Sequence, residues 1–156
     1  MVIEGPLITA VFIERPNRFI TIVEINGELY RSHLPDPGRL KELLIPNAKL
    51  MVRPAPEGSD RKTSYSTVMV EHEGQLISLV STLPNMFVHY ALKKNEIPIL
   101  RPFSLVRSEI TVKNHRFDFL LNDGEGKKFY LEVKSVTFVE NGVAQFPDAV
   151  TMRGMD

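Results

Sequence analysis

The stretch LITAVFIERPNRFITIVEINGELYRSHL, residues 7–34, decides the fold of the first part of the chain. Its segments LITAVFIER and RFITIVEI are rich in β-branched residues, which favour strands, and the short break Pro16-Asn17 joins them. Asn26-Gly27 indicates a hairpin turn, because both positions tolerate the positive φ of a type I′ turn. ELYRSHL then supplies a third strand. Residues 7–34 therefore predict three consecutive strands joined by tight turns.

The β pattern continues beyond residue 34 with one interruption. In PDPGRLKELL, the prolines and the glycine break the sheet, and RLKELL is long enough for only a turn or two of helix. Further strands are predicted in KLMVRP, KTSYSTVMVEHE and QLISLVST, with Glu73-Gly74 as a turn. Five or so strands interrupted by one short helix predict a small Greek-key barrel of the oligonucleotide-binding (OB) kind over residues 1–82.

The pattern changes after Thr82. MFVHYALKKNEI, residues 86–97, has apolar residues near helical spacing, and Asn85 is a plausible cap. Strands are predicted in SLVRSEITV, HRFDFLL and KKFYLEVKSVTFV, and FPDAVTMRGMD at residues 146–156 resembles the start of a helix. A strand hairpin plus one helix cannot cover both faces of a sheet. The expected fold class is therefore α+β, with residues 83–156 forming an incomplete second domain.

Composition excludes several classes of protein. The 156 residues are 43% apolar and 24% charged, which is ordinary globular usage and unlike a disordered tail, a collagen or a coiled coil. No apolar stretch approaches the ~20 residues that span a bilayer, and the N-terminus lacks the basic flank of a signal peptide. There is no cysteine, so we expect a cytoplasmic protein without a membrane partner. Lys+Arg and Asp+Glu are both 19, so any basic patch must come from local clustering.

A predicted hairpin in the second part gathers residues that can carry chemistry. HRFDFLL and FYLEVKSV flank the loop NDGEGK, and pairing of Leu121 near Lys128 or Phe129 sets Asp118 opposite Glu132 or one residue from it. Alternation gives one polar face and one apolar face, which must be core. The polar face would hold Arg116, Asp118, Leu120, Tyr130, Glu132 and Lys134, and the apolar face Phe117, Phe119, Leu131 and Val133.

Two interpretations of the polar face remain open. Directly opposed Cβ atoms lie roughly 4.5–5.5 Å apart, so two carboxylates there repel and need a cation. Mg²⁺ would suit them, and Lys134 beside it would orient a water or stabilise a phosphate, as metal-assisted phosphodiester hydrolysis requires. On this interpretation Asp118→Asn should relieve repulsion and stabilise the metal-free protein slightly. The alternative is a solvated salt-bridge ladder in which Lys134 and Arg116 pair with the two carboxylates.

Basic residues are spread over the predicted barrel and alternate with Tyr30 and Tyr65. They are Arg31, Arg39, Lys41, Arg53, Arg61 and Lys62. Such a surface can follow phosphates and stack bases. Acidic residues such as Glu28, Asp36 and Asp60 lie among them, so a mixed-charge solvated surface is the alternative.

Four segments together resemble the sugar fermentation stimulation protein A (SfsA) family: HLPDPGRLKELL, RKTSYSTVMV, SEITVKNHRFDFLL and YLEVKSVTFVENGVAQFPDAVTMRG. The resemblance implies an OB barrel followed by a domain like the PD-(D/E)XK nucleases, DNA binding without sequence preference, and a regulatory link to sugar (maltose) utilisation. It also implies that Asp118, Glu132 and Lys134 occupy the catalytic positions, and that Asp118, Glu132 and Glu109 are the ligands of Mg²⁺. Arg116 joins the predicted DNA-binding residues.

Two departures from the family pattern shape the functional expectation. Tyr90 stands where the first helix of the nuclease-like domain usually offers a glutamate, and the family continues beyond the point where this sequence stops. We therefore expect weak divalent binding and little or no cleavage by these 156 residues. The leading hypothesis is a DNA-binding protein with a nuclease-like site. The alternatives are an inert DNA-binding or regulatory module, and a barrel that binds a protein or a saccharide.

Overall fold

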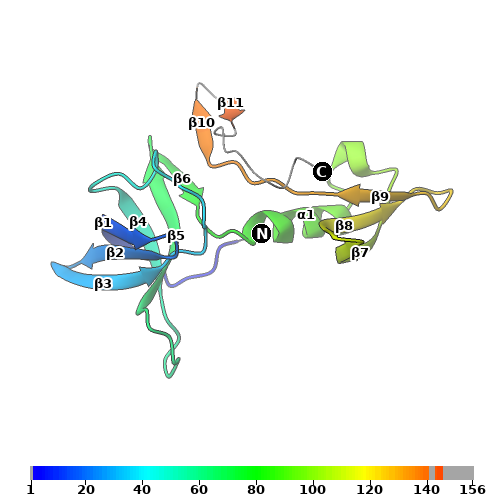
Figure 1. Cartoon of the computed structure of the whole chain (residues 1–156). Coiled ribbons are helices and arrows are strands. Elements are labelled where there is room, and N and C mark those ends of the chain that lie inside the picture. The colour runs from blue at the N-terminus through cyan, green and yellow to red at the C-terminus, as the bar shows by residue number, and fades with distance from the viewer. Residues whose placement is uncertain (1, 141–142, 146–156) are drawn as a thin grey trace. The chain divides into compact units, whose positions relative to one another are not determined.

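The computed structural model describes residues 2–140 and 143–145 (Figure 1). These residues divide into two compact units. One unit contains residues 82–135, and the other contains residues 2–81 together with the described residues from Val136 onward. Among the residues described, no helix has both the length and the apolar composition that crossing a bilayer requires.

The first unit is built on a six-stranded sheet that closes on itself. Its strands are β1 (Ile8–Asn17), β2 (Ile20–Ile25), β3 (Glu28–His33), β4 (Lys49–Pro54), β5 (Tyr65–His72) and β6 (Gln75–Ser78). The order is β3-β2-β1-β4-β5-β6, and a parallel pairing of β3 with β5 joins the first five strands into a ring (Figure 1, blue to green). The five-stranded OB-like barrel predicted from the sequence is therefore confirmed.

Local sequence explains the tight turns and the core of the barrel. Asn26 and Gly27 have φ of 53° and 85°, and Glu73 and Gly74 have φ of 50° and 74°, as type I′ hairpins require. Along β2 the exposure alternates strictly, with every second residue buried. The interior is filled mainly by aliphatic side chains: Ala10, Phe12, Val23, Ile25, Leu34, Leu40, Leu43, Ala48, Leu50, Val52, Val70 and Leu79.

A chain of three hydroxyl groups lies fully buried where the barrel closes. Thr67 Oγ1 of β5 lies 2.8 Å from Thr21 Oγ1 of β2 and 2.8 Å from Ser32 Oγ of β3. Thr21 Oγ1 also donates to the Ser32 carbonyl at 3.4 Å. With that proton assigned, Thr67 donates to Thr21 and Ser32 donates to Thr67, so every hydroxyl proton has an acceptor.

The short helix expected in RLKELL is absent, and that prediction was wrong. Residues 41–44 form a turn, in which the N–H groups of Leu43 and Leu44 donate to the Leu40 carbonyl. Leu40 has a φ of 51°, so the backbone leaves helical geometry where the helix would begin. Leu40 and Leu43 are both buried in the barrel core. Burial of these two side chains, instead of helix propensity, determines the path of the segment.

The second unit combines one helix with a three-stranded antiparallel sheet. Its elements are α1 (Leu83–Lys93), the 3₁₀ turn η1 (Pro98–Leu100), β7 (Ser104–Val112), β8 (His115–Asn122) and β9 (Lys128–Leu131). Leu92 of α1 is buried with Phe119 and Leu121 of β8, and half-buried Val88 and Leu131 pack against them. The apolar stripe of the helix therefore covers one face of the sheet.

Two element boundaries differ from those expected. The helix begins at Leu83 and ends at Lys93, because Pro84 suits the first turn and Asn95, with a φ of 55°, cannot continue it. The strand expected over residues 127–139 is split into β9 and β10 (Phe138–Glu140), and β10 pairs with β11 (Val143–Gln145). The helix start expected at residues 146–156 lies outside the described residues.

Candidate functional site

The register of the hairpin β8–β9 is one of the two expected. Leu121 pairs with Phe129, Leu120 with Tyr130 and Phe119 with Leu131, so Asp118 is next in line with Glu132. The strand β9 ends at Leu131, however. Glu132 and Lys134 therefore follow the strand and do not lie in it, which corrects their predicted placement.

Asp118 is half-buried and accepts a hydrogen bond on each carboxylate oxygen. Asn85 Nδ2 of α1 donates to Oδ1 at 2.6 Å, and the Val133 backbone N–H donates to Oδ2 at 2.7 Å. The carboxylate thus takes the backbone donor that a longer β9 would have used. Asn85 is not the helix cap, because Thr82 occupies that position without a side-chain hydrogen bond. The carboxylate is therefore stabilised by two donors, one from a side-chain amide and one from the backbone.

The other predicted carboxylates are paired with cations. Glu132 Oε1 lies 2.5 Å from Lys134 Nζ, and Glu109 Oε1 lies 2.9 Å from Arg116 Nη2. All four side chains are exposed. The salt-bridge alternative expected pairs across the two strands. Lys134 instead pairs with Glu132 two residues before it, and Arg116 pairs with Glu109 of β7.

A cavity of about 370 Å³ lies between the start of α1 and the strands β7 and β8. Its lining is Asn85, Met86, His89, Ser108, Glu109, Asp118 and Phe119. His89 Nδ1 and Ser108 Oγ are 2.9 Å apart and hydrogen-bonded. Glu109 adopts a φ of 53° inside β7, a conformation that few residues other than glycine take.

The cavity collects two of the predicted site residues, Asp118 and Glu109. Asn85, His89 and Ser108 were not predicted, although the four-residue spacing of Asn85 and His89 places both on one helix face. Within residues 2–140 and 143–145, no three Asp, Glu or His side chains are grouped closely enough to hold a metal ion. A cation here would therefore depend on two carboxylates, Asp118 and Glu109, together with neutral oxygens and water. Mg²⁺ accepts that kind of donor set.

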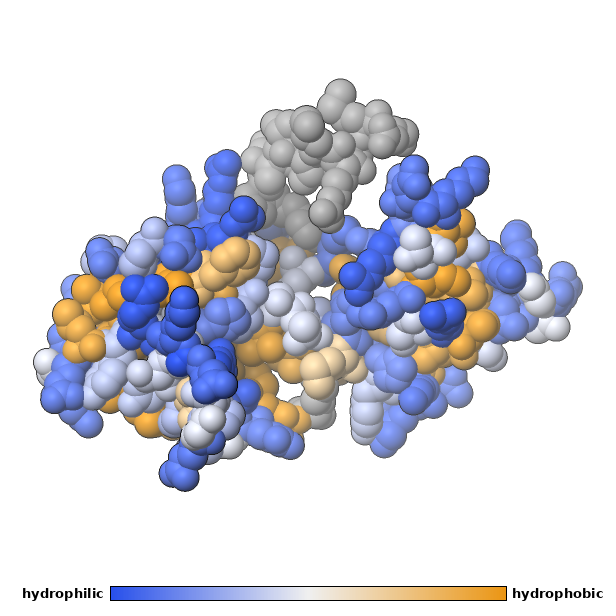
Figure 2. Space-filling view, turned by 60° about the horizontal axis from the view of Figure 1, so that its bottom comes forward, coloured by the Kyte–Doolittle hydropathy of each residue, from blue (hydrophilic) through white to orange (hydrophobic). Residues whose placement is uncertain are grey.

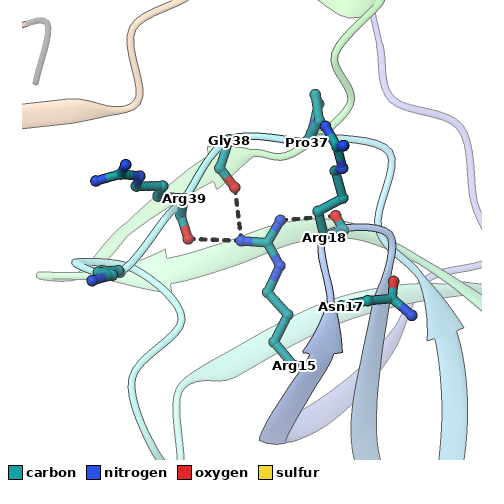
Figure 3. A pocket seen from close by; sticks show the side chains of 7 residues that line it. Arg15, Asn17, Arg18, Pro37, Gly38 and Arg39 are labelled. Carbon is teal, nitrogen blue, oxygen red and sulfur yellow. Dashed lines mark hydrogen bonds between the residues drawn. The ribbon is translucent and has the colours of Figure 1, made fainter. Parts of the chain in front are cut away.

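The barrel carries a second, basic pocket of about 350 Å³ (Figure 3). Its lining is Arg15, Asn17, Arg18, Pro37, Gly38, Arg39 and Lys41. Arg39 and Lys41 were predicted DNA-binding residues, and the fold adds Arg15 near the end of β1 and Arg18 in the turn between β1 and β2. The signal that marks these two is their position on either side of Pro16-Asn17, since the first loop of an OB barrel commonly binds ligands.

The other predicted basic residues have different surroundings. Arg53 is half-buried and donates to the Glu4 carbonyl at 2.6 Å, so it supports the barrel. Arg61 is exposed and donates to Ser66 Oγ at 2.9 Å, and Arg31 and Lys62 are exposed. Figure 2 shows strongly hydrophilic side chains beside hydrophobic ones on the face of the barrel that it presents.

The two tyrosines expected to stack bases are largely occupied. Tyr30 and Tyr65 pack edge to face with ring centroids 5.2 Å apart, and the Tyr30 hydroxyl donates to the Glu28 carboxylate. That hydrogen bond raises the pKa of Tyr30. The exposed aromatic ring next to the basic pocket is instead Phe19, which is 46% exposed.

Each of the two parts of the chain matches a domain of one protein family. Residues 13–79 match the SfsA N-terminal OB domain, and residues 82–156 match the sugar fermentation stimulation protein RE domain. The chain belongs to the sugar fermentation stimulation family. A family homologue from Acetivibrio thermocellus is 45% identical over 99% of this chain, and one from Moorella thermoacetica is 43% identical over 95%.

A solved family structure has the same fold. The structure of Pyrococcus furiosus SfsA in complex with Ca²⁺ superposes with a TM-score of 0.80 at 28% identity, covering 97% of this chain and 64% of that one. The chain spans 66% of the A. thermocellus homologue and 64% of the M. thermoacetica homologue. It therefore corresponds to just under two thirds of the length of these family members.

Proposed function

We propose that the barrel binds DNA without sequence preference, and that this binding serves the regulation of sugar (maltose) metabolism in the cytoplasm. The observation that carries the proposal is the basic pocket, whose lining contains four cationic side chains and no carboxylate. Phosphate contacts of this kind bind the backbone of any sequence alike. The OB topology supports the proposal, because OB barrels bind oligonucleotides at the loop after their first strand. The family name supports the link to sugar metabolism.

A binding comparison separates this proposal from its rivals. Fluorescence anisotropy should give similar dissociation constants for three labelled DNAs of unrelated sequence and equal length, while calorimetry with maltose gives no heat of binding. The double variant Arg39→Gln/Lys41→Gln should weaken binding to all three DNAs equally. Lys128→Gln, which removes a charge from the second unit, is the control. Strong preference for one sequence, or binding of maltose in place of DNA, would contradict the proposal.

We also propose that the cavity of the second unit binds a divalent cation as part of a nuclease-like site. Asp118 and Glu109 would hold it, and both line that cavity. The Ca²⁺ named for the P. furiosus protein supports this proposal. A cation bound there would supply Lewis-acid polarisation of a phosphodiester. Glu132 remains a predicted third ligand, with Lys134 as its ion-pair partner in this structure.

Cation binding can be measured without an activity assay. Calorimetric titration with MnCl₂ should give weak binding that Glu109→Gln reduces and that Glu125→Gln, a carboxylate in the β8–β9 loop, leaves unchanged. Glu109→Gln removes one of the two carboxylates and spares the hydrogen bonds of Asp118. Equal binding by the wild type and Glu109→Gln would exclude Glu109 as a ligand.

A further inference from the structure

The basic pocket is held together by the guanidinium of Arg15. Nη1 donates to the carbonyls of Gly38 and Arg39 at 2.7 Å each, and Nη2 donates to the carbonyls of Arg18 at 2.8 Å and Asp36 at 3.3 Å. Figure 3 shows the guanidinium between the turn at Arg18 and the segment Pro37–Arg39. Burial lowers the pKa of Arg15, and the nearby Asp36 charge opposes that shift. These bonds fix two loops against each other, and they use donors that a ligand would otherwise take.

Three further cations remain available around this anchor. Arg18, Arg39 and Lys41 are exposed, and none of them belongs to an ion pair among the residues that the structure describes. Two carboxylates lie close to these cations in the sequence, Asp36 and Glu42, and neither lines the pocket. Asp36 accepts the Gly38 N–H at 2.7 Å. Three unpaired positive charges on a fixed frame form a site for a multiply charged anion such as phosphate.

An exposed aromatic ring adjoins these cations. The Arg18 guanidinium carbon lies 5.3 Å from the centroid of the Phe19 ring, which is 46% exposed. The Phe19 N–H donates to Asn17 Oδ1 at 2.9 Å, and its carbonyl accepts the Leu34 N–H at 2.8 Å. The backbone of Phe19 is thus held at both its N–H and its carbonyl, so stacking on the ring requires little ordering of the backbone.

We propose that this pocket binds a phosphate of single-stranded DNA while an adjacent unpaired base stacks on the Phe19 ring. The inference rests on the DNA-binding function proposed above, and it gives that function a location and a preference for single strands. Proteins that bind single strands without sequence preference combine basic side chains with aromatic stacking in this way. In a duplex the bases are already stacked on one another, so Phe19 would add nothing to its binding. The ring therefore distinguishes a single strand from a duplex, whereas the cations attract both.

The test compares labelled single-stranded and duplex DNA of the same length. Phe19→Ala should weaken single-strand binding about fivefold or more and leave duplex binding unchanged. Phe19→Tyr, which keeps an aromatic ring, should bind single strands as the wild type does, and this result would also show that the turn tolerates a change at residue 19. Arg18→Gln/Arg39→Gln should reduce the slope of log K against log salt by about 1.4 for single strands. Lys128→Gln is the control for a lost charge outside the pocket.

The outcomes separate this inference from the wider function. If the wild type binds DNA and the Arg18/Arg39 double variant keeps its affinity and salt slope, the pocket assignment is wrong and the DNA-binding proposal stands. If Phe19→Ala weakens duplex and single-strand binding equally, the assigned stacking role is wrong. If the wild type binds neither form of DNA, both proposals fail. If, in that case, the wild type binds inorganic pyrophosphate and the Arg18/Arg39 double variant does not, the pocket is a site for free phosphate and not for DNA.

Discussion

The buried hydroxyl chain at the closure of the barrel gives a stability prediction that the geometry makes quantitative. Thr67→Val keeps the shape of the side chain and removes the group that Thr21 and Ser32 both contact at 2.8 Å. The Ser32 hydroxyl, fully buried, then has a donor without an acceptor. A buried polar group left unpaired costs about 1–3 kcal/mol. We therefore expect Thr67→Val to lower the free energy of unfolding of the barrel by about 2 kcal/mol.

A second variant tests the cause of that loss. In the Thr67→Val background, Ser32→Ala removes the stranded donor, so the double variant should be no less stable than Thr67→Val alone. Such coupling between contacting residues typically amounts to about 0.5–3 kcal/mol. Thr9→Val, an exposed change on β1, is the matched control and should alter stability by less than about 0.5 kcal/mol.

Native-state hydrogen exchange of β2 and β3 amides is the appropriate assay, because it reports opening of the barrel independently of the second unit. A Thr67→Val cost below about 0.5 kcal/mol would refute the assigned hydrogen bonding. So would a double variant whose loss equals the sum of two separate penalties.

Three other predictions concern the candidate sites and pH. Asp118→Asn should destabilise the second unit by about 1 kcal/mol, because an amide oxygen can accept only one of the two bonds that Asn85 and Val133 donate. The loss is measured as faster hydrogen exchange of the Val133 amide. A gain in stability would instead support repulsion between Asp118 and Glu132. The pKa of His33 is lowered, chiefly by burial and secondly by the charge of Arg61. Neutral His33 therefore contributes its full stabilisation above about pH 6.5, the pKa of an unfolded histidine, and this stabilisation is lost as the pH falls through the pKa of His33 in the folded protein. Titration of the His33 ring by NMR should show Arg61→Gln raising that pKa, and an unchanged value would exclude the charge effect. Incubation of the 156-residue chain with plasmid DNA and Mg²⁺ or Mn²⁺ should give little or no nicking, whereas robust nicking abolished by Glu132→Ala would show a competent site.

Local chemistry made the barrel and the hairpin register predictable. Asn26-Gly27 and Glu73-Gly74 fix their turns through backbone preferences that neighbouring strands do not alter. The strand and loop patterns limited the partner of Leu121 to Lys128 or Phe129, and the structure pairs it with Phe129. These features depend on residues close together in the sequence.

The features that sequence reasoning missed depend on partners far away along the chain. Asn85 is of a residue type that often caps helices, yet its side-chain amide donates a hydrogen bond to Asp118 of β8. In the sequence Arg15 resembles an ordinary surface charge, yet its guanidinium donates hydrogen bonds to backbone carbonyls of a loop more than 20 residues later. Just beyond the end of β9, the Val133 N–H donates to the Asp118 carboxylate instead of to a strand carbonyl. In each case a side chain satisfied a backbone or polar group that only the folded chain brings within reach.

The salt dependence of DNA binding tests the central claim most directly. Arg15 is occupied by carbonyls, so Arg18, Arg39 and Lys41 are the pocket cations that can neutralise phosphates. At about 0.7 per phosphate on single-stranded DNA, these three account for a slope of about −2 in log K against log salt. We predict a slope at least that steep, equal for unrelated sequences and reduced by about 2 when all three are changed to glutamine. Binding that is independent of salt, or a slope that the triple variant leaves unchanged, would contradict the account.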